Sequence, residues 1–152
     1  MQQREKFMRE ALKQAVKAKE LDEVPVGAVV VRNGEVIARA YNTKNKNKNA
    51  LLHAELEVLK KAQKVLGDWH LLDCDLYVTL EPCPMCAGAC INTRLRAVYF
   101  GAYDPKAGCC GSLYNLPEDK RFNHRVEVVG GILGQECATI LTEFFKSKRK
   151  GV

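Results

Sequence analysis

The chain has 152 residues, 47% of them hydrophobic, which suits a single domain over residues 1–152 whose core needs no disulfide support. Seven cysteines, an odd number, and an N-terminus without an apolar run argue against a secreted, disulfide-bonded protein and favour the reducing cytoplasm. A formal charge of +6 favours a polyanionic partner without identifying it, and no apolar run reaches the ~18 residues of a membrane span.

The hydrophobic pattern predicts alternating helices and strands. In chain order we expect a helix over residues 4–19, strands over 26–31 and 36–41, a helix over 51–66, a strand over 76–80, a helix that starts within 81–84 and runs to about 93, strands over 97–101 and 125–130, and a helix over 137–148. Asn33-Gly34 is the strongest short hairpin signal and joins the first two strands. Such alternation indicates a three-layer α/β domain.

Two short motifs carry the chemistry, His53-Ala54-Glu55 and Pro82-Cys83-Pro84-Met85-Cys86. One imidazole and two thiols suit Zn²⁺, and a Cys-x-x-Cys at the start of a helix lets both sulfurs converge on one ion. Cys90 lies one turn beyond Cys86, displaced by roughly 5–6 Å along the helix axis, an offset that a Zn–S bond of about 2.3 Å tolerates poorly. We therefore predict three protein ligands, His53, Cys83 and Cys86, and a position left for water.

Glu55 follows His53 by two residues, close enough to reach that water without binding the metal. Zinc lowers the pKa of a bound water toward ~7, and a carboxyl beside it can accept and return a proton. The partial positive charge of a helix N-terminus also helps to hold Cys83 and Cys86 as thiolates. We predict that Glu55 is the catalytic acid and base.

The order of the two motifs resembles the signature of the zinc-dependent cytidine/deoxycytidylate deaminase superfamily. Flanking segments narrow the resemblance to bacterial tRNA-specific adenosine deaminases of the TadA type. Those segments are Val24-Pro25-Val26-Gly27-Ala28, the run from Thr79 to Ala89, the run from Phe100 to Lys106, and Phe122-Asn123-His124-Arg125. Together they are spread over most of the chain.

The resemblance implies a fold, a cofactor and a reaction. The fold is a three-layer α/β/α cytidine deaminase-like domain with a five-stranded mixed sheet, and the assembly is a homodimer with one Zn²⁺ per subunit. The reaction is hydrolytic deamination of adenosine to inosine at the wobble position, 34, of a tRNA anticodon, with tRNA-Arg as the substrate. Water activated by zinc attacks C6 of adenine, Glu55 moves the protons, and ammonia leaves.

Substrate contacts also follow from the resemblance. Asn42, at the end of the second predicted strand, matches the asparagine that hydrogen-bonds the target base. Asp104 and Lys106 match a loop that meets the flanking nucleotides, and Asn123 matches another nucleotide-contacting position. The resemblance thus implies one contact with the target base, from Asn42, and three with other nucleotides.

The last predicted helix carries aromatic and basic residues of two kinds. At least one of Phe144 and Phe145 is expected in the core, while Phe145 with Arg149 matches a contact with the anticodon loop. Basic residues gather in the tail and in the polar loop before His53: Lys146, Lys148, Arg149 and Lys150, and Lys44, Lys46 and Lys48. By composition these residues are either solvated or in contact with RNA.

Three alternatives stay open at this point. Deaminases of free cytidine, adenine or guanine need the same metal motif, although the flanking segments and the basic tail favour a polynucleotide. A zinc that only joins two helices in a non-catalytic RNA-binding module is a second alternative, against which Glu55 argues. Cys109 and Cys110 are interpreted as small loop residues rather than a redox switch or a second metal site, because no ligand partner is spaced for them.

Overall fold

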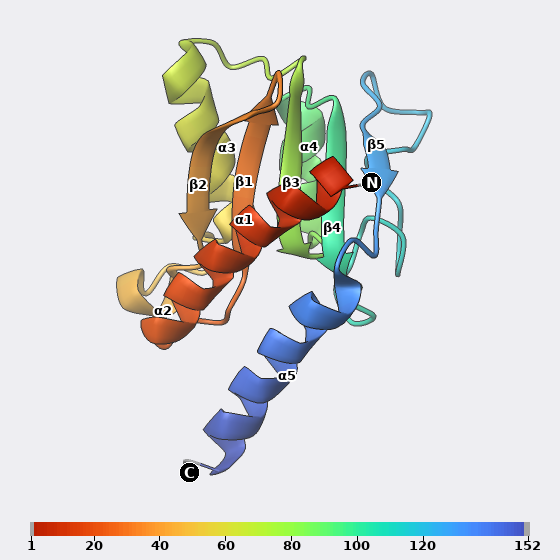
Figure 1. The fold of residues 1–152 in the computed structure, drawn as a ribbon. Helices are drawn as coiled ribbons and strands as arrows, with labels where there is room; N and C mark the ends of the chain where they lie inside the picture. Colours follow the sequence, from red (N-terminus) through yellow and green to blue (C-terminus); the bar gives the residue numbers. More distant parts are fainter. Residues whose placement is uncertain (1, 151–152) are drawn as a thin grey trace.

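The computed structural model describes residues 2–150. A five-stranded mixed sheet, in the order β2-β1-β3-β4-β5, forms the middle layer, with helices on both faces (Figure 1). The elements are α1 (Gln2–Glu20), β1 (Gly27–Arg32), β2 (Glu35–Tyr41), α2 (Lys44–Asn47), α3 (Ala54–Leu66), β3 (Cys74–Leu80), α4 (Pro84–Asn92), β4 (Ala97–Ala102), β5 (Glu127–Val129) and α5 (Gly134–Lys150). The three-layer α/β/α fold with a five-stranded mixed sheet is confirmed.

The sheet combines an antiparallel and a parallel half. β1 lies between β2 and β3 and is antiparallel to both, whereas β4 is parallel to β3 and β5. Asn33 and Gly34 form the predicted hairpin turn, with φ of 51° and 78°, the positive values that a two-residue hairpin needs. β5 is shorter than predicted because Val126 N–H donates to Pro117 O (2.8 Å) instead of extending the ladder.

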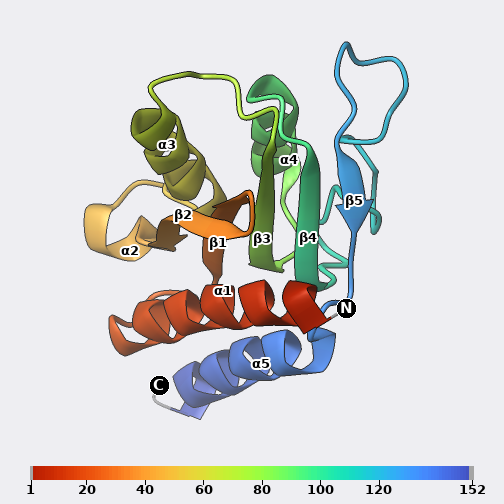
Figure 2. The same ribbon diagram turned by 45° about the horizontal axis from the view of Figure 1, so that its top comes forward.

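The central strands are buried on both faces. Figure 2 shows α1 and α5 on one face of the sheet and α3 and α4 on the other. Along β1, Val30 belongs to the core cluster under α3 and α4, while Val29 belongs to the cluster under α1 and α5. Val78 and Tyr77 divide in the same way along β3. Two core faces explain why these strands are nearly continuous apolar runs.

The chain segments that build the site lie at one end of the central strands. The start of β1 pairs with the end of β2, as Gly27 with Tyr41, and Ala28 pairs with Val78 near the end of β3. α3 and α4 therefore both begin at this end of the strands, α3 after β2 and α4 shortly after β3. None of the helices described in residues 2–150 is long and apolar enough to cross a membrane.

The polar segment before His53 contains a helical turn that the sequence did not predict. Residues 44–47 form α2 because the carboxylate of Glu23 accepts the backbone N–H groups of Asn45 (2.9 Å) and Lys46 (2.6 Å). Lys48 ends the turn in the left-handed conformation, with φ of 51°. A buried acid 22 residues upstream of Asn45 thus shapes a segment whose own composition indicates a loop.

Candidate active site

The N-termini of α3 and α4 place the two predicted motifs side by side. His53 and Cys83 are the residues immediately before the two helices, and both have extended backbone, with φ and ψ of −80° and 149° for His53 and −75° and 175° for Cys83. The predicted helix start at residue 51 is wrong, because Asn42 Oδ1 accepts the N–H of Ala54 (2.8 Å) and begins α3 there. His53 therefore precedes the helix, and Glu55 lies in its first turn.

Three ligand atoms converge at this point, one each from His53, Cys83 and Cys86. His53 Nδ1 lies 3.7 Å from Cys83 Sγ and 3.5 Å from Cys86 Sγ. All three atoms lie within 4.8 Å of one another, and within residues 2–150 this is the one group of its kind. We call these residues the metal cluster. Cys90 is fully buried beyond it and is not a member.

The charges in the metal cluster suit a divalent cation. The hydrogen bond from Cys86, and to a lesser degree that with His53, lowers the pKa of Cys83 to about 4 against the opposing effect of burial. The same bond and burial raise the pKa of Cys86, and the hydrogen bond with Cys83 raises the pKa of His53. One imidazole and two sulfurs fit a tetrahedral zinc site that lacks a fourth protein ligand.

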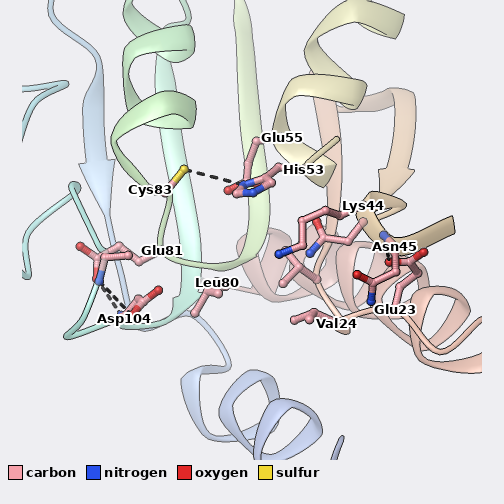
Figure 3. A pocket seen from close by; sticks show the side chains of 13 residues that line it. Glu23, Val24, Lys44, Asn45, His53, Glu55, Leu80, Glu81, Cys83 and Asp104 are labelled. Carbon is pink, nitrogen blue, oxygen red and sulfur yellow. Dashed lines mark hydrogen bonds between the residues drawn. The ribbon is translucent and has the colours of Figure 1, made fainter. Parts of the chain in front are cut away.

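Glu55 is buried beside the metal cluster, with 4% of its surface exposed. Burial raises the pKa of its carboxyl from 4.5 to about 7. In Figure 3 the Glu55 side chain lies against His53 and faces the same cavity as Cys83. A carboxyl with a pKa near neutrality can both accept and donate a proton, which is the property expected of a catalytic acid and base.

A cavity of about 200 Å³ opens over His53, Cys83 and Glu55. Two loops flank it, residues 42–49, which we call the first wall, and residues 104–112, which we call the second wall. The cavity is lined by Glu23, Val24, Val26, Asn42, Lys44, Asn45, His53, Glu55, Leu80, Glu81, Cys83, Asp104 and Ala107. The two walls and the segments that carry the metal cluster both contribute polar groups, and the residues before β1 and the end of β3 contribute most of the apolar groups.

Asn42 lines the cavity. Its Oδ1 accepts the N–H of Ala54, which leaves the Nδ2 amine for another acceptor. Within residues 2–150 that amine donates no hydrogen bond. Asn42 can therefore fix the start of α3 and present a donor to a ligand at the same time.

Of the other predicted contacts, Asp104 lines the cavity and the rest lie outside it. Asp104 Oδ1 accepts the backbone N–H groups of Lys106 (3.0 Å) and Ala107 (3.2 Å), so its carboxylate shapes the second wall. Lys106 and Asn123 are exposed on loops away from the cavity lining. These positions can meet only the parts of a ligand that extend beyond the cavity.

The last helix separates its two phenylalanines. Phe144 is 7% exposed and Phe145 is 45% exposed, which confirms that one of the pair is in the core. Arg149 is exposed near the end of α5, which runs beyond the edge of the sheet in Figure 1. Lys148 forms an ion pair with Asp22, just after α1. Phe145 and Arg149 thus lie on an exposed arm rather than in the cavity.

The sequence did not predict two buried carboxylates that line the cavity, Glu23 and Glu81. Glu23 is 1% exposed and Glu81 is 2% exposed, and both accept backbone N–H groups from the walls. Glu23 directly precedes a segment that carries the family resemblance, and Glu81 lies inside another. No sequence pattern indicates the role of either residue. Apolar neighbours on both sides are a signal for Glu81 alone, since Asp22 precedes Glu23.

Cys109 and Cys110 are buried in the second wall, with 1% and 2% of their surfaces exposed. Burial raises the pKa of both thiols. Neither belongs to a second group of metal-binding side chains within the described residues. The interpretation as small loop residues agrees with this placement.

Comparison with known proteins identifies the class. The family model described as MafB19-like deaminase matches residues 2–149, so the fold and the metal cluster are those of a deaminase. A tRNA-specific adenosine deaminase of Bacillus subtilis (strain 168) is 53% identical over 150 residues, which cover 99% of this chain and 93% of that protein. The chain belongs to the family of tRNA-specific adenosine deaminases, which confirms the resemblance found in the sequence.

Two solved structures place the chain within that class. One, from studies of A-to-I editing by tRNA:A34 deaminases at the wobble position of transfer RNA, is 44% identical with a TM-score of 0.85, covering 89% of this chain and 98% of that chain. The other, guanine deaminase from Bacillus subtilis, is 39% identical with a TM-score of 0.62, covering 65% of this chain and 64% of that chain. The similarity to the RNA-editing enzyme is the more extensive of the two.

Proposed function

We propose that this protein hydrolyses adenosine to inosine at the wobble position, 34, of a tRNA anticodon. The observation that carries the proposal is the convergence of His53, Cys83 and Cys86 with the buried Glu55 at one polar cavity. The 53% identity to a tRNA-specific adenosine deaminase over nearly the whole chain supports this substrate.

The metal is proposed to be one Zn²⁺ per subunit, held by His53, Cys83 and Cys86. When bound, zinc supplies Lewis-acid chemistry that lowers the pKa of water to about 7. Glu55 accepts the proton that the attacking water loses and delivers it to N1 of adenine. It then takes the proton of the hydroxyl group added at C6 and passes it to the departing amino group, so that adenosine and water give inosine and ammonia. One buried carboxyl can serve both steps because its pKa lies near neutrality.

The cavity walls are proposed to orient the base. Asn42 donates from Nδ2 to an acceptor on the purine while its Oδ1 remains bonded to Ala54 N–H. Val26 and Leu80 supply apolar surface for the ring. A base held here must leave its stack, which a single-stranded anticodon loop permits at low cost.

The remaining contacts are proposed to be with the nucleotides next to the reacting base, from Asp104 in the cavity lining and from residues outside it. Asp104 and Lys106 of the second wall, with Asn123, meet these nucleotides, while Phe145 and Arg149 on α5 meet the anticodon loop. The charge of +6 favours such a polyanion. We also propose tRNA-Arg as the substrate, a homodimer as the assembly and the cytoplasm as the location.

A deaminase of a free base is the second candidate, because the chain is 39% identical to a guanine deaminase over 65% of its length. The metal cluster and Glu55 would serve either substrate. The two candidates differ in whether the exposed residues of the walls and α5 matter for turnover.

The test is a deamination assay read by mass spectrometry. An anticodon stem-loop RNA with adenosine at the wobble position is compared with free adenosine, cytidine and guanine, and Glu55→Ala is the control. We expect inosine in the RNA and none with the control. Turnover of a free base with the RNA unchanged would overturn the RNA assignment.

A further inference from the structure

Glu81 is a buried carboxylate with an unusual set of partners. It follows β3 directly, two residues before Cys83, and is 2% exposed. Its oxygens accept the backbone N–H groups of Asp104 (2.9 Å), Cys110 (3.1 Å) and Ser112 (2.9 Å), and the hydroxyl of Ser112. All four donors belong to the second wall. Glu81 therefore joins the segment that carries the metal-binding cysteines to a loop more than 20 residues away.

The second wall passes directly over this carboxylate. A Cβ built on Gly108 would collide with the carboxylate carbon and both oxygens of Glu81, so only glycine lets the loop approach this closely. Cys109 N–H also donates to Pro82 O (2.9 Å), beside Glu81. Figure 3 shows Glu81 joined to Asp104 on one side of the cavity, opposite Glu23 and Asn45. The geometry is that of an anion enclosed by a loop built to surround it.

Four donors face the two oxygens of this carboxylate. Three are backbone N–H groups and the fourth is the hydroxyl of Ser112, so the acceptor positions of both oxygens are used. A charged acceptor makes stronger hydrogen bonds to backbone N–H groups than a neutral one. Every donor is therefore satisfied only if the residue at position 81 is an anion of this length.

We propose that Glu81 is a positioning residue for substrate recognition, whose carboxylate fixes the second wall and thereby places Asp104 and Lys106 against the nucleotides that flank the reacting base. The inference rests on the proposed function, because those nucleotides exist only in an RNA substrate. Glu81 lines the cavity, but all the hydrogen bonds that its oxygens accept come from the second wall. Contacts with the flanking nucleotides stabilise the bound RNA equally in the ground state and in the transition state. Loss of Glu81 should therefore raise KM for the RNA and leave kcat unchanged.

The decisive variant is Glu81→Gln, which keeps the shape of the side chain but replaces one acceptor oxygen by an amide NH2 group that faces backbone N–H donors. We expect KM for the anticodon stem-loop RNA to rise roughly tenfold or more, with kcat within about threefold of the parent. Zinc content should stay at the parental value. Glu35→Gln, an exposed acid at the start of β2, removes the same charge and should leave both constants unchanged.

Two further variants keep the proposal falsifiable if Glu81→Gln does not fold. Gly108→Ala forces the wall off the carboxylate without changing any charge, and Ser112→Ala removes one donor. Both should raise KM for the RNA without lowering kcat, the serine variant less than the glycine variant. Combining Gly108→Ala with Glu81→Gln should add little, because both act by releasing the same loop.

The outcomes separate this inference from the proposed function. A parent protein that does not deaminate the RNA overturns the proposed function. A parent that does, with unchanged KM in the Glu81, Gly108 and Ser112 variants, overturns the inference alone. Loss of zinc, or a fall in kcat without a rise in KM, also overturns it, because Glu81 would then act through the neighbouring cysteines.

Discussion

The metal cluster and the two walls of the cavity are built on different principles. The cluster uses residues at the starts of α3 and α4, where backbone direction and ligand spacing are set within a few residues. The walls are short loops held by buried acids from elsewhere in the chain, Glu23 for the first and Glu81 for the second. The chemistry is thus fixed locally, whereas the shape of the opening depends on long-range hydrogen bonds.

The largest effect is expected when a ligand of the metal cluster is changed, compared with a neighbouring cysteine that is not a ligand. Cys86→Ser should lose zinc and with it all turnover, because a change at one ligand of a three-ligand site leaves the ion weakly bound. Cys90→Ala, one turn further along α4, should retain zinc, because Cys90 is buried outside the cluster. Metal analysis of the two purified variants checks this. Zinc absent from Cys90→Ala would show that the ligand set is wrong.

The next effect separates metal binding from proton transfer. Glu55→Ala should keep zinc but lose roughly 10²–10⁴-fold in kcat, the usual contribution of a positioned acid and base. Steady-state assays at saturating RNA, alongside metal analysis, measure both quantities. Parental turnover in this variant would refute the role given to Glu55.

This division explains what the sequence could predict. The grouping of His53, Cys83 and Cys86 could be predicted because ligand type and the spacing of the two cysteines are visible within a few residues. α2 was missed because Glu23, not the composition of residues 44–47, makes that segment helical. Glu81 was missed for the same reason, since its donors lie more than 20 residues away. Long-range hydrogen bonds to backbone N–H groups leave no pattern at the residues that receive them.

Asn42 belongs to the first wall and also sets the start of α3, next to the metal cluster. Asn42→Asp keeps the oxygen that accepts Ala54 N–H but loses the Nδ2 donor, whereas Asn42→Ala loses both. If the donor binds the base, both variants should lose about tenfold or more in kcat/KM, the value of one hydrogen bond to a buried ligand. Parental kcat/KM in Asn42→Asp, with loss only in Asn42→Ala, would reduce Asn42 to a residue that begins α3.

A smaller effect is expected from the acid that holds the first wall. Glu23→Gln places an amine against the N–H groups of Asn45 and Lys46 and should loosen α2. Because Glu23 accepts two hydrogen bonds from its wall and Glu81 accepts four from the other, KM for RNA should rise by only about threefold. Glu20→Gln, exposed at the end of α1, is the matched control. A larger effect than that of Glu81→Gln would reverse the ranking of the two walls.

The smallest effect lies beyond both walls, on α5. Lys146 and Arg149 are exposed, while Lys148 is already paired with Asp22. Changing Lys146 and Arg149 together to alanine should weaken RNA binding and reduce the slope of log affinity against log salt by about 0.7 for each phosphate that is no longer neutralised. Lys148→Ala should change the slope less, because its charge is partly neutralised within the protein. Binding titrations at several salt concentrations measure these slopes.

The control for this change removes the same charge from another exposed helix. Lys64 lies in the last turn of α3, and Lys60, in the middle of the helix, is paired with Glu57; both are away from the N-terminus at the metal cluster. If net charge alone governs affinity, the paired alanine variants of α3 and α5 will show the same reduction in slope. If α5 touches the RNA, only its variant will show it, while turnover of saturating RNA stays parental in both. An unchanged slope in the α5 variant would make the basic tail a solvated extension and confine RNA recognition to the cavity and its walls.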